Sequence, residues 1–268
     1  MAALIVKIIL TCLAAYCIVV ILAFLFQDKM MYFPAGEFGK CPEAERMGVK
    51  AVENGNVRFY VRKADRPKLC MVFFHGNAGS ACDRMYFIDM FEELPADLVV
   101  FEYPGYGGDP RKPGETVILE EALALINILQ SDYSDQLPVF LAGESLGTGV
   151  ATWLAGQTQI KGLVLISPYT SIVDVAAAHY PFLPVRLLSR NRFLAEHWAK
   201  NVNTPAIAFH GKKDTIIPIR FARQQIEHFK GDARLVELEN TGHNDILVNG
   251  RESIQSRVKQ FIEIHAGS

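Results

Sequence analysis

The sequence has no excess of positive charge. It carries 27 Lys and Arg residues against 29 Asp and Glu residues. Because no basic stripe is visible, nothing in the chain favours nucleic acid as a partner. No Ser- or Gly-rich linker, low-complexity tract or repeat of about 20–50 residues divides the chain. The 268 residues therefore suit one large domain with a sizeable core.

Cysteine is also scarce, with five residues at positions 12, 17, 41, 70 and 82. Their spacing matches neither a CxxC motif nor a set of metal ligands, and an odd number does not define a disulfide framework. We therefore expect small buried hydrophobes, with no metal and no cofactor. A bond between Cys41 and Cys82 stays open, because only geometry can decide it. The absence of an N-x-S/T glycosylation site leaves the compartment open as well.

One long apolar run is present near the amino terminus. Residues 8–26 carry no charge and are rich in Ile, Leu, Val and Phe, which is enough to cross a bilayer core as a helix. A cleaved signal peptide is the main alternative, but the run ends in a poor cleavage site. A buried helix of a soluble protein is the other alternative. We predict a retained transmembrane anchor over residues 1–29 in contact with the membrane lipid bilayer, followed by a domain over residues 30–268.

The charges around this run give no clean orientation. Lys7 and the amino terminus lie on the short side, whereas several basic residues follow Lys29 on the other side. These charges argue mildly against translocation of the domain, but an N-terminal anchor before a large domain more often translocates it. We expect the exoplasmic or periplasmic side and leave the cytoplasmic side open.

Strands alternate with helices along the remaining chain. Apolar runs predict strands at residues 57–61, 70–74, 98–102, 139–142, 163–166, 206–209 and 235–238. Helical spacing covers residues 115–129, 150–155, 220–229 and 251–264. This α/β alternation predicts a mostly parallel central sheet flanked by helices. Residues 168–204 break the pattern and form either a small cap or an ordinary helical connection. Their apolar residues either line an acyl pocket or pack in the core; they are Tyr169, Tyr180, Phe182, Leu183 and Phe193.

The most informative motif is Gly143-Glu144-Ser145-Leu146-Gly147, a G-x-S-x-G pentapeptide. It lies between a buried-strand signal and a helical signal, which is the context of a nucleophile elbow. Glycines two residues either side of Ser145 leave room for a sharp, strained turn. The turn also places the Leu146 N–H at a helix N-terminus, where a developing oxyanion can sit.

A serine nucleophile needs a histidine to take its proton and a carboxylate to orient that histidine. In a parallel sheet these groups lie on loops at the carboxyl ends of strands. Asp214 follows the strand at 206–209, and His243 follows the strand at 235–238. We predict Asp214 as the acid and His243 as the base, in preference to Asp174, Asp245, His75 and His210. Asn77, in the loop after the strand at 70–74, is the predicted second oxyanion donor beside Leu146.

The motifs HGNAG, YPGYGGDP, GESLG, GKKDTIIP and GHNDI, after an apolar segment ending in MMYFP, carry a family resemblance. The chain resembles the α/β-hydrolase superfamily, and within it the Bem46-like, membrane-anchored serine hydrolases related to the ABHD13 and ABHD17 groups. The resemblance covers about residues 20–265 and implies the same triad and oxyanion hole. One departure is Asp109, which stands in the tyrosine–glycine loop where many relatives carry serine. That difference leaves the substrate contacts of the loop in doubt.

These features predict a serine hydrolase that cleaves carboxylic ester or thioester bonds of a small-molecule, lipid-like or acylated substrate. Ser145 attacks the carbonyl, His243 moves the proton and Asp214 orients His243. A peptidase or amidase of the same fold is one alternative. A non-catalytic, membrane-anchored scaffold is another, although the intact residues at all three positions argue against it.

Overall fold

The computed structural model describes residues 1–132 and 137–267. One eight-stranded sheet organises the domain. In spatial order its strands are β10 (Ala233–Leu238), β9 (Ala206–Gly211), β8 (Gly162–Ile166), β7 (Val139–Glu144), β4 (Leu69–Phe74), β6 (Ala96–Glu102), β3 (Val57–Arg62) and β2 (Lys50–Asn54). Of these eight strands, β3 runs opposite to the other seven, which confirms the mostly parallel sheet.

All seven predicted strands are present, but three others escaped the sequence pattern. The edge strand β2 is mostly exposed on both faces, so its residues do not alternate between apolar and polar. The strands β1 (Phe33–Pro34) and β5 (Ala78–Gly79) form a separate two-residue parallel pair, which is too short to leave a periodic signal. This pair joins the segment after the N-terminal helix to the loop after β4.

Helices cover both faces of the large sheet, as predicted. Buried side chains of α4 (Glu115–Asp132), α5 (Leu146–Ala155), α8 (Ala195–Ala199) and α9 (Ile219–Ile226) belong to one apolar cluster. Those of α2 (Pro42–Arg46), α3 (Met85–Phe91), α10 (Ile246–Asn249) and α11 (Arg251–His265) belong to a second cluster on the other face. The central strand β4 is buried throughout, which accounts for its continuous apolar run.

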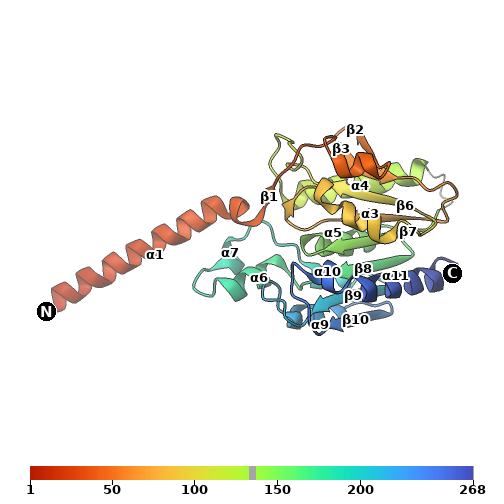
Figure 1. Ribbon diagram of the computed structural model, residues 1–268. Coiled ribbons are helices and arrows are strands. Elements are labelled where there is room, and N and C mark those ends of the chain that lie inside the picture. The colour runs from red at the N-terminus through yellow and green to blue at the C-terminus, as the bar shows by residue number, and fades with distance from the viewer. Residues whose placement is uncertain (133–136, 268) are drawn as a thin grey trace.

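The chain between β8 and β9, residues 167–205, is called the β8–β9 segment below. It contains α6 (Ile172–His179), α7 (Val185–Leu188) and α8. Ser171 caps α6, because its hydroxyl accepts a hydrogen bond from the backbone N–H of Asp174. Figure 1 shows α6 and α7 beside the C-terminal end of the N-terminal helix.

The N-terminal helix α1 (Ala2–Met31) extends away from the domain (Figure 1). None of its residues is buried in the protein, and it is long and apolar enough to cross a membrane. The helix continues past Phe26, the last residue of the apolar run, for another five residues. It ends where Tyr32 adopts an extended backbone and the chain enters β1.

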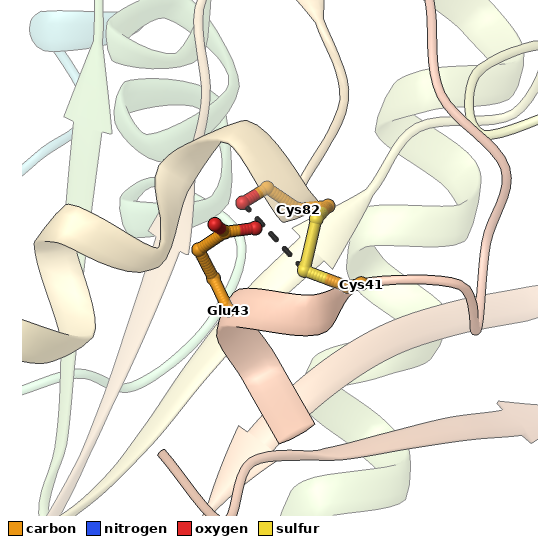
Figure 2. Close-up of side chains that lie close together, drawn as sticks. All are labelled: Cys41, Glu43 and Cys82. Atoms are coloured by element: carbon orange, nitrogen blue, oxygen red, sulfur yellow. Dashed lines mark hydrogen bonds between the residues drawn. A yellow bond between two sulfur atoms is a disulfide. The ribbon is translucent and has the colours of Figure 1, made fainter. Parts of the chain in front are cut away.

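Cys41 and Cys82 form a disulfide, with their Cα atoms 5.6 Å apart (Figure 2). The bond that the sequence left open is therefore present. Cys70 is buried as expected, whereas Cys12 and Cys17 on α1 are exposed in the protein. The bond joins the residue before α2 to the first residue of η1 (Cys82–Arg84), which follows β5. The carboxylate of Glu43 lies next to the sulfurs (Figure 2), but disulfide sulfurs are not thiolates and do not suit a metal ion.

Replacing both Cys41 and Cys82 by Ser should lower the stability of the protein in the absence of reductant. The bond closes a loop with a sequence separation of 41 residues, so its loss restores entropy to the unfolded chain. A loss of about 2–4 kcal/mol corresponds to a fall in Tm of roughly 5–15 °C in detergent solution. Reductant should lower the Tm of wild type to that of the double variant. A wild-type Tm that does not respond to reductant would contradict the disulfide.

Candidate active site

Ser145 lies in the tight turn between β7 and α5, as the pentapeptide predicts. Its backbone has φ 52°, a left-handed value that costs energy for a residue with a Cβ. The flanking glycines make this turn possible. A Cβ on Gly147 would overlap the carbonyl oxygen of Phe74 at the end of β4, and one on Gly143 would overlap the carbonyl oxygen of Gly147. The turn is also fixed to the sheet, because the Ser145 N–H donates to the carbonyl of Ile166 at 2.8 Å.

The structure brings Ser145, His243 and Asp214 into one hydrogen-bonded chain. His243 Nε2 lies 3.0 Å from Ser145 Oγ. On the other side of the ring, His243 Nδ1 donates to Asp214 Oδ2 at 2.7 Å. These distances are those of a serine, a base and an orienting carboxylate in acyl-transfer sites. The Asp214 side chain is fully buried, whereas 13% of the His243 side chain is exposed.

The carboxylate of Asp214 is held in its ionised form. Burial acts to raise its pKa, but hydrogen bonds from His210 and His243, the charge of His243 and the N–H of Ile217 outweigh burial and lower the pKa below its usual range. The second oxygen, Oδ1, accepts from the N–H groups of Ile216 and Ile217 at 2.9 and 2.7 Å. The acceptor facing His243 therefore stays charged and fixed in position.

His210, which the sequence ranks below His243 as the base, also contacts Asp214. Its ring is fully buried, and Nε2 lies 3.3 Å from Asp214 Oδ2. The same nitrogen donates to the carbonyl of Ile217 at 2.7 Å. His210 thereby holds the turn that supplies the N–H groups bonded to Asp214. The tight sequence spacing of His210 and Asp214 at the end of β9 is the signal that could have indicated this support.

The loop that carries His243 is braced by a second acidic residue. Asp245 accepts from the N–H of Gly242 at 2.6 Å and from the side-chain amide of Asn249 at 2.6 Å. The loop is also bonded to the loop that carries Asp214, because the Lys213 N–H donates to the carbonyl of Thr241 at 3.0 Å. Asp245 thus shapes the histidine loop, while Asp214 alone of the two contacts the histidine ring.

The loop after β4 lies directly against the serine. A Cβ built on Gly76 would sit 3.6 Å from the Cβ of Ser145. Asn77, one of the two predicted oxyanion donors, is the next residue, and Leu146, the other, begins α5 immediately after the serine. The backbone amides at both positions therefore belong to segments that flank Ser145.

Two tyrosines of the YPGYGGDP motif, to which the sequence assigns no role, are hydrogen-bonded to this loop. Tyr103 donates its hydroxyl to the carbonyl of His75 at 2.6 Å, and Tyr106 donates to the carbonyl of Asn77 at 2.7 Å. Both follow β6, the strand next to β4 in the sheet. Because parallel neighbours end at the same edge, tyrosines directly after β6 could have been expected beside the β4 loop.

Two acidic residues of the sequence motifs, Glu144 and Asp109, are paired with basic or tyrosine side chains. Glu144 accepts from the hydroxyl of Tyr86 at 2.6 Å and pairs with Arg84 at 3.3 Å, so it is engaged with α3 and η1. Asp109, where the chain departs from the family pattern, pairs with Arg58 at 3.2 Å and with Arg111. Hydrogen bonds and the charge of Arg111 overcome the effect of burial and lower the pKa of Asp109 to about 2. Asp109 therefore serves an ion-pair network.

A largely apolar cavity of about 230 Å³ lies between the end of α1 and the β8–β9 segment. Asn77 is one of its lining residues, whereas Ser145 and His243 are not among them. Tyr180 and Leu183 line it, as an acyl pocket would require. Tyr169 and Phe193 are instead fully buried in the core, and Phe182 is 60% exposed.

The chain shares sequence features with known hydrolases. A sequence profile of the α/β hydrolase fold matches residues 70–196. An uncharacterized protein of Mycobacterium tuberculosis is 34% identical over 70% of this chain and 67% of its own length. A lysophosphatidylserine lipase, ABHD12, of Danio rerio is 28% identical over 58% of this chain, and the match spans 45% of the lipase.

Solved structures share the fold at lower identity. An esterase of Pyrococcus furiosus superposes with a TM-score of 0.71 at 18% identity, over 88% of this chain and 98% of the esterase. The protein Est1E of Butyrivibrio proteoclasticus superposes with a TM-score of 0.62 at 17% identity, over 80% of this chain and 99% of its own.

Replacing Gly147 by Ala should disrupt the turn at Ser145. The added methyl group would overlap the Phe74 carbonyl oxygen, which belongs to the backbone of a central strand and cannot move aside cheaply. We expect a loss of about 3 kcal/mol or more, or failure to fold, measured by thermal unfolding. Gly156→Ala, at the end of the same helix, is the matched control, because the nearest atom to its added Cβ is 3.5 Å away. Equal effects of the two substitutions would contradict this packing.

Proposed function

The chain belongs to the α/β-hydrolase family and is an esterase- or lipase-like enzyme, and we propose that it hydrolyses carboxylic ester or thioester bonds through an acyl-enzyme on Ser145. The observation that carries this proposal is the hydrogen-bonded chain from Ser145 through His243 to Asp214. The fold alone would not support this proposal, because one fold hosts many functions.

In the proposed reaction, Ser145 Oγ attacks the carbonyl carbon of the substrate while His243 Nε2 takes the hydroxyl proton. The ionised Asp214 holds the Nδ1–H and stabilises the positive charge that the ring acquires. His243 then protonates the departing alcohol or thiol. Water enters, gives a proton to His243 Nε2 and attacks the acyl carbon. The bond to Ser145 Oγ then breaks, His243 returns the proton to that oxygen, and the carboxylic acid leaves.

The negative charge on the carbonyl oxygen needs donors that are already in place. We assign the N–H groups of Asn77 and Leu146 to this role. The assignment is supported by the closeness of Gly76 to Ser145 and by the position of Leu146 at the start of α5. The peptide group that carries the Asn77 N–H is held at its other end, because His75 Nδ1 donates to the Gly76 carbonyl at 2.7 Å.

A lipid-like substrate fits the surroundings of the site. The apolar cavity that includes Asn77 in its lining suits a hydrocarbon chain better than a polar group. The similarity to a protein named as a lysophosphatidylserine lipase points in the same direction, although the match spans less than half of that lipase. We therefore place esters of fatty acids first among the candidate substrates.

We further propose that α1 anchors the enzyme in a membrane, with the domain on the exoplasmic, periplasmic or lumenal side. The length and composition of α1 support the anchor. The Cys41–Cys82 bond supports the side, because disulfides form and persist in oxidising compartments and are rare in the cytosol. The disulfide thus supports one side of the membrane, whereas the charges around residues 8–26 give no clean orientation.

A fluorophosphonate probe should label Ser145 in the wild-type protein. Ser145→Ala should abolish labelling, because Ser145 is the only serine among the described residues whose hydroxyl is hydrogen-bonded to His243. Asp214→Asn should slow labelling about a thousandfold or more, since it removes the charge that orients His243. Ser253→Ala, on the exposed side of α11, is the matched control and should label at the wild-type rate. Folded wild-type protein that does not label would rule out the proposed mechanism and favour a scaffold.

Protease added to sealed vesicles should test the proposed side of the membrane. In vesicles whose lumen corresponds to the exoplasmic side, the domain should resist digestion until detergent opens the membrane. An unrelated lumenal protein serves as the control for vesicle integrity. Digestion of the domain in intact vesicles would place it in the cytosol and refute the assignment.

A further inference from the structure

The C-terminal end of α1 is bonded to the domain. The side chain of Gln27 accepts from the N–H of Arg190 at 2.7 Å and donates to the carbonyl of Leu188 at 3.3 Å. Asp28 pairs with Arg190 at 3.1 Å and accepts from the amide of Asn191 at 2.9 Å. These contacts join the end of the membrane helix to the β8–β9 segment through both side chains and backbone.

Nearer the amino terminus of α1, the β8–β9 segment lies beside the apolar run of residues 8–26. Tyr16 donates its hydroxyl to the carbonyl of Phe182 at 2.8 Å. Tyr16 is ten residues before Phe26, the end of the run, which corresponds to about 15 Å along a helix. The tip of the β8–β9 segment therefore lies at the level of the bilayer core. Its exposed apolar side chains fit that position, because Phe182 is 60% and Leu187 85% exposed.

The cavity of about 230 Å³ lies between these two partners. Val20, Ala23 and Met31 of α1 form part of its lining, and Val175, Ala176 and Leu183 face them from the β8–β9 segment. Its polar lining residues are largely occupied with other protein groups. Side chains already bonded elsewhere are those of Gln27, Asn77, His179, Ser189 and Asn191. An occupant of this cavity therefore meets mostly hydrocarbon.

The cavity borders the loop that lies beside the serine. Asn77 belongs to its lining, and a Cβ added to the preceding residue, Gly76, would lie 3.6 Å from the Cβ of Ser145. The side-chain amide of Asn77 donates to the carbonyl of Met31 at 2.7 Å, so the last residue of α1 is bonded to the same loop. An acyl chain in the cavity would thus lie between α1, on the side of the membrane core, and the loop that flanks Ser145.

We propose that α1 is a wall of the substrate site: the acyl chain of a membrane lipid ester occupies the cavity between α1 and the β8–β9 segment and enters it from the bilayer. This inference rests on the proposed function, because it supplies the substrate of that same serine. It makes the membrane helix a determinant of acyl-chain specificity in addition to an anchor. Short, water-soluble esters need no such wall and reach Ser145 without filling the cavity.

Two cavity-filling substitutions test this proposal in the full-length protein, reconstituted in phosphatidylcholine vesicles. Ala23→Trp fills the cavity from α1, and Ala176→Trp fills it from α6. Each should lower kcat/KM for p-nitrophenyl palmitate in the vesicles by about tenfold or more, because the bulky ring takes the place of the chain. For p-nitrophenyl butyrate, kcat/KM should stay within about twofold of wild type.

Matched controls lie on the same two helices. Ala15→Trp on α1 and Ala178→Trp on α6 place the same ring on exposed positions outside the cavity, and both should hydrolyse the two esters like wild type. Fluorophosphonate labelling of all four variants reports whether Ser145 is intact. Normal labelling with an unchanged palmitate rate in both cavity variants would overturn the inference and leave the proposed function standing. Wild-type protein that neither labels nor hydrolyses either ester would instead refute the proposed function.

Discussion

The close approach of Gly147 to the end of β4 is the contact on which the site depends. Because a side chain there would overlap the Phe74 carbonyl oxygen, only glycine lets the turn after β7 press against the neighbouring strand. That approach puts Ser145 beside Gly76 and places the start of α5 next to the loop after β4. The left-handed backbone of Ser145 is held by packing on both sides, as strained residues at functional sites commonly are.

The second organising feature is the attachment of α1 to the β8–β9 segment. One ion pair at Asp28 and hydrogen bonds at Gln27 and Asp28 hold the two together where the apolar run ends. Tyr16 is bonded to the same segment, so a membrane that held α1, as we propose, would also position the domain. A serine oriented in this way would meet substrates at the bilayer surface, which links the anchor to the chemistry.

Much of this arrangement could be predicted from the sequence, and the reasons are local. Apolar runs ending at Phe74, Phe209 and Leu238 indicated buried parallel strands, and parallel strands bring their following loops to one edge. That rule, with the chain order Ser, Asp, His, predicts Asp214 and His243 beside Ser145, and in the structure the three side chains are hydrogen-bonded to one another. The features that could not be predicted depend on contacts between segments far apart in sequence. Neither the Cys41–Cys82 bond nor the tyrosine supports of the β4 loop leave a periodic signal.

An acyl group caught on Ser145 would be the most direct evidence for the chemistry. After rapid acid quenching of a reaction with a p-nitrophenyl ester, mass spectrometry of the digested protein should find one added acyl mass on the peptide that contains Ser145. The first turnover should also release p-nitrophenol in a burst, because the acyl-enzyme forms before water resolves it. An acyl adduct on another residue, or ester hydrolysis that survives Ser145→Ala, would contradict a serine acyl-enzyme in this protein.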